Sequence, residues 1–387
     1  MKKDWTYKKL GEVCETTSGG TPSKSKMEYY ENGDIPWLRS GELSNGEIYS
    51  TELCITQKGL DNSSAKIIPA GTVSIAMYGA TVGEVGIIKK PMCTNQAICN
   101  ILPNEQFIPN FIRYVLVAYK PKFISLATGG AQPNISQNII KNTSIPIPPL
   151  AIQRSIVAEL DLLHSVISKK KEQLRELDNL AQSLFYQMFG DPITNPMGWE
   201  VKKLGEVCDV RDGTHDSPKY VQSSDYVLIT SKNIVNGEID FSSCNYITKE
   251  DYDSINKRSK VDVGDIIMPM IGTIGGPIIV NETSHKYGIK NVALIKFNIT
   301  GVLNIYVKSL LENQSYTEYL KSLNKGGTQK FIALGTIRTL PIPLPPLSLQ
   351  QSFAAKVSAI EAQKQAITQS IHHTEALLAQ RMDQYFG

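Results

Sequence analysis

A histidine next to an aspartate is the clearest candidate for catalysis in this sequence. His215 and Asp216 lie in the segment Asp212-Gly213-Thr214-His215-Asp216-Ser217-Pro218, and a His–Asp pair is typical of a general base. No nucleophile stands at a fixed spacing from His215. Two interpretations therefore stay open: a loop residue that donates a hydrogen bond to a ligand, or an ordinary turn residue.

The sequence lacks the patterns of other chemistry. Methyl transfer to a DNA base requires a Gly-rich S-adenosylmethionine pocket and an Asn/Asp-Pro-Pro-aromatic loop, but the two Pro-Pro pairs precede Leu150 and Leu347. No G-x-x-x-x-G-K-[ST] phosphate loop and no paired acidic and lysine pattern of a nuclease is present. The six cysteines form no C-x-x-C pair, which predicts reduced thiols and no metal site. We therefore expect a chain that is not an enzyme by itself.

The composition is that of a globular protein with nearly balanced charge. The 387 residues suffice for two or three domains, 41% of them are hydrophobic, and the net charge is only +3. This balance excludes a grossly basic, histone-like chain but leaves room for a local basic surface. Apolar runs stay shorter than the ~18 residues of a membrane span, and the first residues lack the apolar core of a signal peptide. We expect a cytoplasmic protein with no membrane partner.

The sequence segments that must position the candidate residues occur twice in the chain. The segment Trp5–Cys14 returns as Trp199–Cys208 with eight of ten positions identical. A Gly-Gly-x-Gln loop and a following Ile-Pro-x-Pro-Pro-Leu-x-x-Gln motif, which ends at Gln153 or Gln350, also occur in both halves. These repeats predict one duplicated unit with divergent loops on a shared scaffold.

Each half divides into a globular part and a long helix. The globular parts, 1–149 and 199–346, contain short apolar runs between Gly-, Asn- and Ser-rich turns, which predicts α+β domains that are mostly β. No helix-breaking residue follows either Pro-Pro pair for nearly 40 positions. We therefore predict long helices over 150–190 and 347–387, with a linker at 191–198. A helix of about 40 residues spans ~60 Å and cannot fold back into a small domain.

The two helices share a heptad pattern. Their apolar residues alternate in steps of four and three, so we expect the helices to pack as an antiparallel coiled coil. The alternative is that each apolar seam packs on its own domain. Polar residues such as Lys170 interrupt the seam, and we expect Phe185 and Leu377 to remain as apolar surface for outside partners. The predicted seam consists of Ile156, Leu160, Leu163, Ile167, Leu174, Leu177, Leu184, Phe353, Val357, Ile360, Ile367, Ile371 and Leu378.

The doubled Lys-Leu-Gly-Glu-Val segment, the Gly-Gly-x-Gln loop and the Pro-Pro-Leu-x-x-Gln helix start together resemble the specificity (S) subunits of type I restriction-modification systems, over the whole chain. This resemblance implies two target-recognition domains that each read half of a bipartite DNA sequence, separated by the antiparallel helices. It implies double-stranded DNA, two methyltransferase (M) subunits and restriction (R) subunits as partners. S-adenosylmethionine, ATP and Mg²⁺ would then belong to the partners. The family often has an acidic residue where this chain has Ile152 and Leu349, which affects only the local helix start.

Divergent loops on equal scaffolds favour an asymmetric DNA target, because two different half-sites require two different readers. The M and R subunits would be positioned by this recognition. The alternative is a protein-binding coiled-coil adaptor without DNA specificity.

Polar and basic loop residues are the candidates for DNA contact. Lys and Arg suit phosphates, and Arg, Lys, Asn, Gln, Ser and Thr can hydrogen-bond to base edges. The alternative is that Asn45 only closes a hairpin with Gly46, and that tight turns alone explain the glycines after Tyr78. In the first half the candidates are Ser18, Gly19, Thr21, Lys24, Lys26, Arg39, Ser40, Asn45, Tyr78, Thr81 and Gln132. In the second half they are Thr214, His215, Lys219, Ser231, Lys232, Asn233, Thr273, Gln329 and Lys330.

Overall fold

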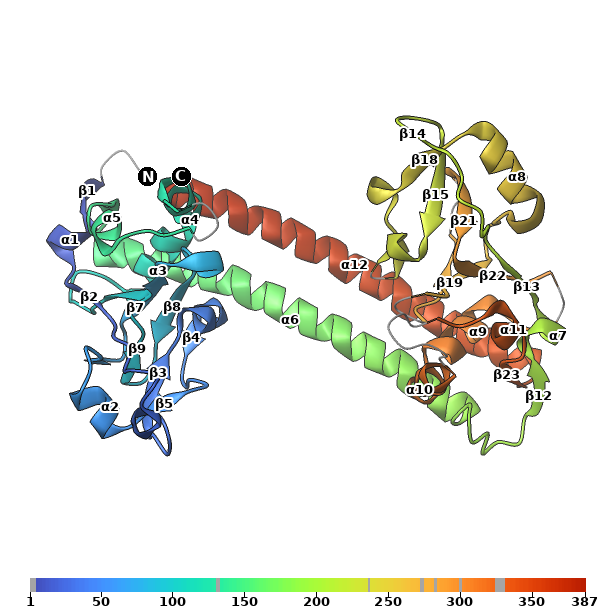
Figure 1. Cartoon of the computed structure of the whole chain (residues 1–387), viewed down its shortest axis with the longest axis horizontal. Helices are drawn as coiled ribbons and strands as arrows, with labels where there is room; N and C mark the ends of the chain where they lie inside the picture. The colour runs from blue at the N-terminus through green and yellow to red at the C-terminus, as the bar shows by residue number, and fades with distance from the viewer. Residues whose placement is uncertain are drawn as a thin grey trace. The chain divides into compact units, whose positions relative to one another are not determined.

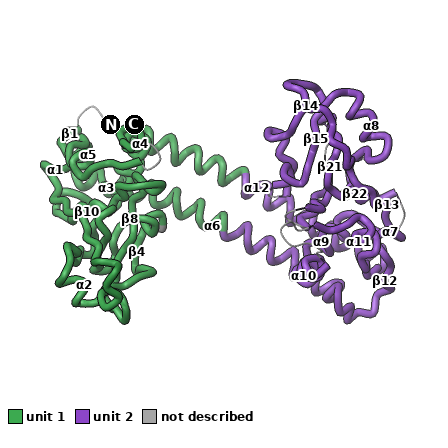
Figure 2. The backbone as a smooth tube through the Cα atoms, in the orientation of Figure 1, with its two compact units in different colours: residues 1–171, 369–387 green, residues 172–368 purple. Residues whose placement is uncertain are grey.

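Two compact units make up the chain. The computed structural model describes residues 5–129, 133–235, 237–271, 275–281, 284–298, 301–323 and 331–387 (Figure 1). The first unit contains residues 1–171 and 369–387, and the second contains residues 172–368 (Figure 2). Each unit therefore holds one globular domain together with a part of both long helices.

Two small sheets form the first globular domain. The parallel pairing of β3 (Ile35–Leu38) with β9 (Met92–Thr94), which places Trp37 opposite Cys93, belongs to the smaller sheet. The five-stranded sheet has the order β2 (Thr16–Ser18), β10 (Ile98–Ile101), β7 (Val73–Ala76), β8 (Val85–Ile88), β4 (Glu47–Ile48). The four-stranded sheet has the order β5 (Cys54–Ile55), β3 (Ile35–Leu38), β9 (Met92–Thr94), β6 (Ile67–Ile68). A separate antiparallel pair joins β1 (Thr6–Lys9) to β11 (Ser144–Ile147).

Short helices complete this domain. Helix α3 (Pro109–Ala118) begins with a proline, whose fixed φ suits the first helical turn, and packs on β7 and β8. Its buried face includes Phe111 and Val115, which contribute to the main core of the unit. The remaining helices are α1 (Leu10–Val13), η2 (Met27–Tyr29), η3 (Ser40–Asn45), α2 (Gln57–Asp61), η4 (Gly79–Thr81), α4 (Lys120–Leu126) and α5 (Gln137–Lys141).

The second globular domain repeats this plan. Strand β15 (Tyr226–Thr230) pairs parallel with β21 (Lys286–Lys290), with Leu228 opposite Gly288. One four-stranded sheet has the order β13 (Asp209–Asp212), β22 (Val292–Lys296), β19 (Ile266–Pro269), β20 (Ile278–Ile279). The other has the order β14 (Tyr220–Val221), β18 (Asn245–Ile247), β15 (Tyr226–Thr230), β21 (Lys286–Lys290). Two-stranded pairs join β12 (Glu200–Lys203) to β23 (Pro341–Leu344) and β16 (Ile234–Val235) to β17 (Glu238–Ile239).

The helices of the second domain show where the two copies diverge. Helix α8 (Lys249–Ser259) has 11 residues and packs on β15 and β21, whereas α2 at the corresponding place in the first domain has 5. The other helices are α7 (Leu204–Val207), η5 (Ser231–Asn233), η6 (Phe241–Ser243), α9 (Asn304–Glu312), α10 (Gln314–Ser322) and α11 (Leu334–Arg338). The expected α+β fold with a duplicated, mostly β domain is confirmed.

The two long helices, α6 (Leu150–Phe189) and α12 (Leu347–Phe386), pack against each other in antiparallel fashion. Within the first unit, Arg381 Nε lies 2.8 Å from Glu159 Oε1, and Lys170 donates to Ser370 further along α6. Residue numbers therefore rise along one helix as they fall along the other. Within the second unit, the ion pair Lys364–Asp178 (2.7 Å) and the ring contact Phe185–Phe353 follow the same order.

The predicted seam residues are covered along both helices, and some of them, such as Leu160 and Phe353, belong to the core of the adjoining globular domain. Leu160 and Phe353 are fully buried, and none of the 13 predicted seam residues is exposed. The prediction for Phe185 was wrong, because this side chain is 2% exposed and stacks on Tyr306 of α9. The heptad pattern missed this contact because the end of α6 packs on the second domain as well as on α12. Leu377 is 40% exposed, as expected.

A buried glutamine fastens the start of each long helix to its domain. Gln153 accepts a hydrogen bond from the Ile108 N–H (3.0 Å) at the start of α3, and donates to the Pro148 carbonyl (2.9 Å). Gln350 repeats this arrangement with the Leu303 N–H (2.9 Å) and the Pro345 carbonyl (2.9 Å). Both glutamines have no exposed surface. The repeated Pro-Pro-Leu-x-x-Gln motif thus encodes the joint between domain and helix.

Candidate nucleic-acid interface

In the first domain, a polar loop crosses the carboxyl ends of the parallel strands β3 and β9. The Gly20 N–H donates to the Thr94 carbonyl (2.8 Å), and the Asn95 N–H donates to the Leu38 carbonyl (2.9 Å). Trp37 Nε1 donates to the Gly20 carbonyl (2.9 Å) and so fixes the loop to β3. Ligands commonly bind outside the carboxyl ends of parallel strands, because loops from several strands meet there. We call this surface, formed by residues 18–26, 39–45 and 94–97, the first edge.

The second domain has an equivalent edge. The Thr214 N–H donates to the Ile289 carbonyl (2.9 Å), and the Gly213 N–H donates to the Val292 carbonyl (3.1 Å). Ser231 Oγ donates to the Asn291 carbonyl (2.8 Å) and holds the following loop against the same strand end. Residues 212–219, 230–233 and 289–292 form this second edge. The structure therefore brings together the candidates of residues 18–45 in the first half and those of residues 214–233 in the second.

Glycine is required where each loop crosses the strand end. A Cβ on Gly19 would lie 2.2 Å from the Thr94 carbonyl oxygen, and a Cβ on Gly213 would lie 2.3 Å from that of Ile289. Neither position has room for a side chain. This close packing accounts for Gly19 without a DNA contact.

In the first domain a third loop, residues 77–81, lies next to the edge. In the first domain the Met77 N–H donates to the Ala97 carbonyl (2.8 Å), and Thr81 Oγ1 donates to the Tyr78 carbonyl (3.2 Å). Tyr78 is 41% exposed, so its ring is available to a ligand. In the second domain the Met270 N–H donates to the Asn291 carbonyl (3.4 Å).

The basic residues of the first edge differ in how they are held. The Arg39 guanidinium pairs with Glu52 and lies 3.5 Å from Glu42. Lys26 Nζ donates to the Tyr29 hydroxyl (3.0 Å). Lys24 is exposed and has no ion pair with any described residue. Lys24 is therefore free to meet a phosphate, whereas Arg39 must exchange a carboxylate for a new partner.

A capping residue fixes the backbone of the second loop in each edge. Glu42 is 9% exposed; its carboxylate accepts from the Arg39 N–H (3.1 Å) and from the Glu52 N–H (2.9 Å). Asn233 takes the same place in the second domain, where its Oδ1 accepts from the Thr230 N–H (2.9 Å). Asn233 is 5% exposed and also donates to Ser243. Its amide is thus used inside the domain.

The His215 side chain contacts Asp212 rather than Asp216, its neighbour in the sequence. His215 Nε2 lies 2.6 Å from Asp212 Oδ2, and the Asp216 N–H donates to Thr214 Oγ1 (3.1 Å). Asp212 also pairs with Arg258 of α8. A carboxylate shared with an arginine holds the loop in place, and the His215 side chain is 66% exposed. This geometry suits a hydrogen-bond donor or acceptor presented to a ligand.

The other candidates divide into exposed, half-buried and undescribed residues. Ser18, Lys219 and Lys232 are exposed, and Thr21, Ser40, Thr81, Thr214 and Ser231 are half-buried. Thr21 donates to Gln96, and the Lys219 N–H donates to Asp251 (3.0 Å). Gln132, Thr273, Gln329 and Lys330 lie outside the described residues, as does the side chain of Asn45. Gly46 has a φ of 75°, which accounts for glycine after Asn45.

Sequence patterns missed the residues that hold these loops. Arg258 lies 43 positions after His215, and Glu52 lies 13 positions after Arg39, so no local motif links them. Glu42 could have been found, because an acidic residue three positions after a helix N-cap can accept a hydrogen bond from the N-cap N–H, as Glu42 does from Arg39.

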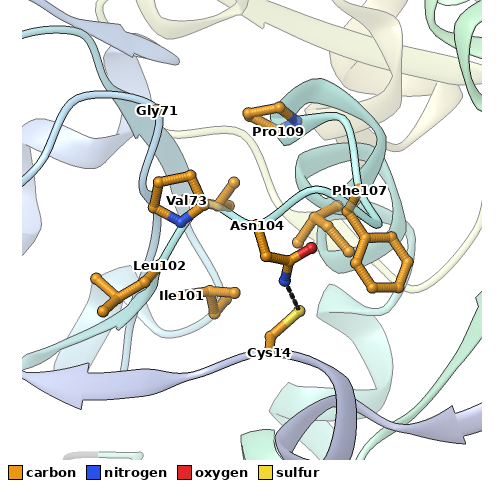
Figure 3. A pocket seen from close by; sticks show the side chains of 10 residues that line it. Cys14, Gly71, Val73, Ile101, Leu102, Asn104, Phe107 and Pro109 are labelled. Carbon is orange, nitrogen blue, oxygen red and sulfur yellow. Dashed lines mark hydrogen bonds between the residues drawn. The ribbon is translucent and has the colours of Figure 1, made fainter. Parts of the chain in front are cut away.

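One cavity in the first domain is too small to hold a cofactor. This apolar cavity, between Cys14, Val73 and Phe107, measures about 10 Å³ and holds at most about one water (Figure 3). Asn104 Nδ2 lies 3.4 Å from Cys14 Sγ at its wall, and burial raises the pKa of this thiol although the hydrogen bond opposes the rise. No group of three His, Cys, Asp or Glu side chains in the described ranges could hold a metal ion. No helix in these ranges is long and apolar enough to cross a membrane.

Comparison with known proteins gives consistent matches over most of the chain. The family description "Type I restriction modification DNA specificity domain" matches residues 2–179 and again residues 196–374. The type I restriction enzyme MjaIX specificity subunit of Methanocaldococcus jannaschii is 29% identical over an alignment of 396 positions. This alignment covers 93% of this chain and 87% of that protein. The EcoR124I/EcoR124II specificity subunit of Escherichia coli is 31% identical over 178 residues, 44% of each chain.

Solved structures share the fold. The S subunit of a type I restriction-modification system from M. genitalium superposes with a TM-score of 0.58 at 13% identity, covering 99% of this chain and 96% of that one. A chain from a structural study of "complex assembly" and "conformational transition of the type I R-M system" gives a TM-score of 0.62 at 21% identity, covering 99% and 97%.

Proposed function

Since the chain belongs to the family of type I restriction-modification DNA specificity subunits, we propose that its first and second edges read the two halves of a bipartite, asymmetric DNA target. The protein is the DNA specificity subunit of such a system. One observation supports the assignment of the edges: the same backbone arrangement carries different side chains in the two domains. Lys24 and Arg39 lie at the first edge, where the second has His215 and Lys232.

The basic and polar side chains of each edge suit duplex DNA. Exposed Lys24 and Lys232 can neutralise phosphates, and Arg39 or His215 can hydrogen-bond to base edges in the major groove. To bind DNA, the Arg39 side chain would exchange its ion pair with exposed Glu52 for an acceptor on the duplex. The adaptor alternative offers no reason for two equivalent edges to carry different polar side chains.

The chemistry of the complex belongs to partner subunits in this proposal. Type I specificity subunits act with methyltransferase and restriction subunits, and we assign two M subunits to this chain because the fold is duplicated. S-adenosylmethionine, ATP and Mg²⁺ bind to those partners, in the cytoplasm. The pure chain, with or without S-adenosylmethionine, neither methylates nor cleaves DNA; methyl transfer by the pure chain would contradict this. Native mass spectrometry of the assembled methyltransferase measures the number of M subunits.

Domain exchange tests the assignment of the edges. Residues 199–346 are replaced by the equivalent part of a relative with a known target, and methylated adenines are mapped across the genome. We expect one half-site to change and the other to stay the same. A change in both half-sites, or in neither, would show that the domains do not read independently.

A further inference from the structure

A groove of about 340 Å³ opens at the first edge beside Arg39. Met27 and Leu53, which are 65% and 41% exposed, line it. Trp37, only 3% exposed, lies at its base with Tyr30. Large apolar side chains thus gather on a loop surface that is otherwise polar.

The base of this groove is rigid. The Trp37 indole donates to the Gly20 carbonyl (2.9 Å), and the Tyr30 hydroxyl donates to the Pro22 carbonyl (2.5 Å). The two rings meet edge to face with centroids 5.9 Å apart, a favourable arrangement for aromatic pairs. The groove is therefore formed before any ligand arrives.

Charged groups line the same groove. Lys24 and Arg39 supply hydrogen-bond donors, and Glu31 supplies an acceptor. The groove therefore combines apolar surface with two cations and one carboxylate. A ligand that fits must offer an apolar group. Next to this group it must offer hydrogen-bond acceptors for the two cations and a hydrogen-bond donor for the carboxylate.

The major-groove edge of an A·T pair has this chemistry. Thymine presents a C5-methyl group and the O4 acceptor, and adenine presents the N7 acceptor and the N6 amino donor, whereas a G·C pair presents no methyl group. We propose that this groove binds the C5-methyl group of a thymine in the half-site read by the first domain, with Met27 and Leu53 as specificity-determining contacts. The inference rests on the proposed function and adds the identity of one base pair.

Deoxyuridine tests the inference, because it differs from thymidine only by the missing methyl group. Each thymine of the mapped target is replaced in turn, and the dissociation constant is measured for the complex of the full chain with its methyltransferase subunits. Burial of one methyl group predicts a roughly fourfold weaker binding at one position of the first half-site. The variants Met27→Ala and Leu53→Ala should bind thymine and uracil duplexes nearly equally at that position.

Ile124→Ala is the matched control, since Ile124 is 52% exposed in the same domain and does not line the groove. This variant should keep the fourfold preference for thymine. The inference is overturned if no thymine of the first half-site shows the methyl effect, or if Met27→Ala and Leu53→Ala retain it in full. Failure of the proposed function looks different: the wild-type complex would then bind target and scrambled duplexes equally.

Discussion

The joint between the second domain and α12 depends on one buried amide, which makes Gln350→Met a sharp test of the fold. The change keeps the length of the side chain and removes its hydrogen bonds. These are the bond from the Leu303 N–H (2.9 Å) and the bonds to the carbonyls of Pro345 (2.9 Å) and Gly301 (3.2 Å). A net contribution of about 1 kcal/mol per hydrogen bond gives a loss of about 3 kcal/mol. The loss falls on the start of α9, because Leu303 is its N-cap.

Hydrogen exchange followed by mass spectrometry measures this loss locally. A change of about 3 kcal/mol in the free energy of opening should speed amide exchange in α9 by roughly 100-fold. Helix α3 in the first domain provides an internal reference, since its own glutamine, Gln153, is unchanged. Gln351→Met is the matched control, because Gln351 is exposed on the same turn of α12. If α9 exchange changes by less than twofold, the glutamine does not fasten the helix and the repeated motif needs another explanation.

Three further predictions concern DNA contacts, acid stability and target spacing. Arg39→Ala and Lys232→Ala should each weaken methylation of the cognate site, by about 1–3 kcal/mol where the side chain contacts a base, and unchanged methylation kinetics in both would reduce these loops to structural turns. Hydrogen bonds from Lys260 and Lys296 hold the pKa of Asp262 below its ordinary value. The depressed pKa means that this contribution to stability is present above pH ~4 and is lost as the pH falls further, so the stability difference between wild type and Asp262→Asn, measured by urea unfolding, should vanish in acid. Four residues inserted near the middle of α6 add ~6 Å of helix and should lengthen the DNA spacer by one or two base pairs without changing either half-site, as methylome sequencing would show; an unchanged spacer at full activity would refute this role of the helix.

The duplication and the heptads made most of the architecture predictable. A repeat in the order of motifs requires a repeat in the order of elements, and the matching strand pairs β1–β11 and β12–β23 follow from it. The seam was predictable because the residues facing a partner helix recur every 3.5 positions. Phe185 was not, because its partner Tyr306 lies 121 positions away in another element.

The sequence predicted that the candidate residues lie in loops. It did not predict which residues they contact. Polarity and glycine content identified residues 18–26 and 212–219 as surface loops. The ion pairs Arg39–Glu52 and Asp212–Arg258 depend on strand pairing, which brings distant segments together. The groove at Met27 and Leu53 was missed for the same reason: two exposed apolar residues on separate segments carry no joint signal in the sequence.

The polar residues that interrupt the seam determine the register of the two helices. The apolar residues alone leave this register open. Leucine and isoleucine pack acceptably in several registers, since each shift by a heptad restores an apolar seam. Lys170 donates to Ser370 in the first unit, and Lys364 pairs with Asp178 (2.7 Å) in the second. Burial lowers the pKa of Lys364, but its hydrogen bonds with Asp178 and Glu361 outweigh this effect and the pKa is raised, so the amine stays charged. A shift between the helices would separate Lys170 from Ser370 and Lys364 from Asp178, while Lys364 would keep Glu361 on its own helix. A half-buried ammonium group that loses its partner on the other helix costs free energy. The two lysines thus select one register at some expense in stability.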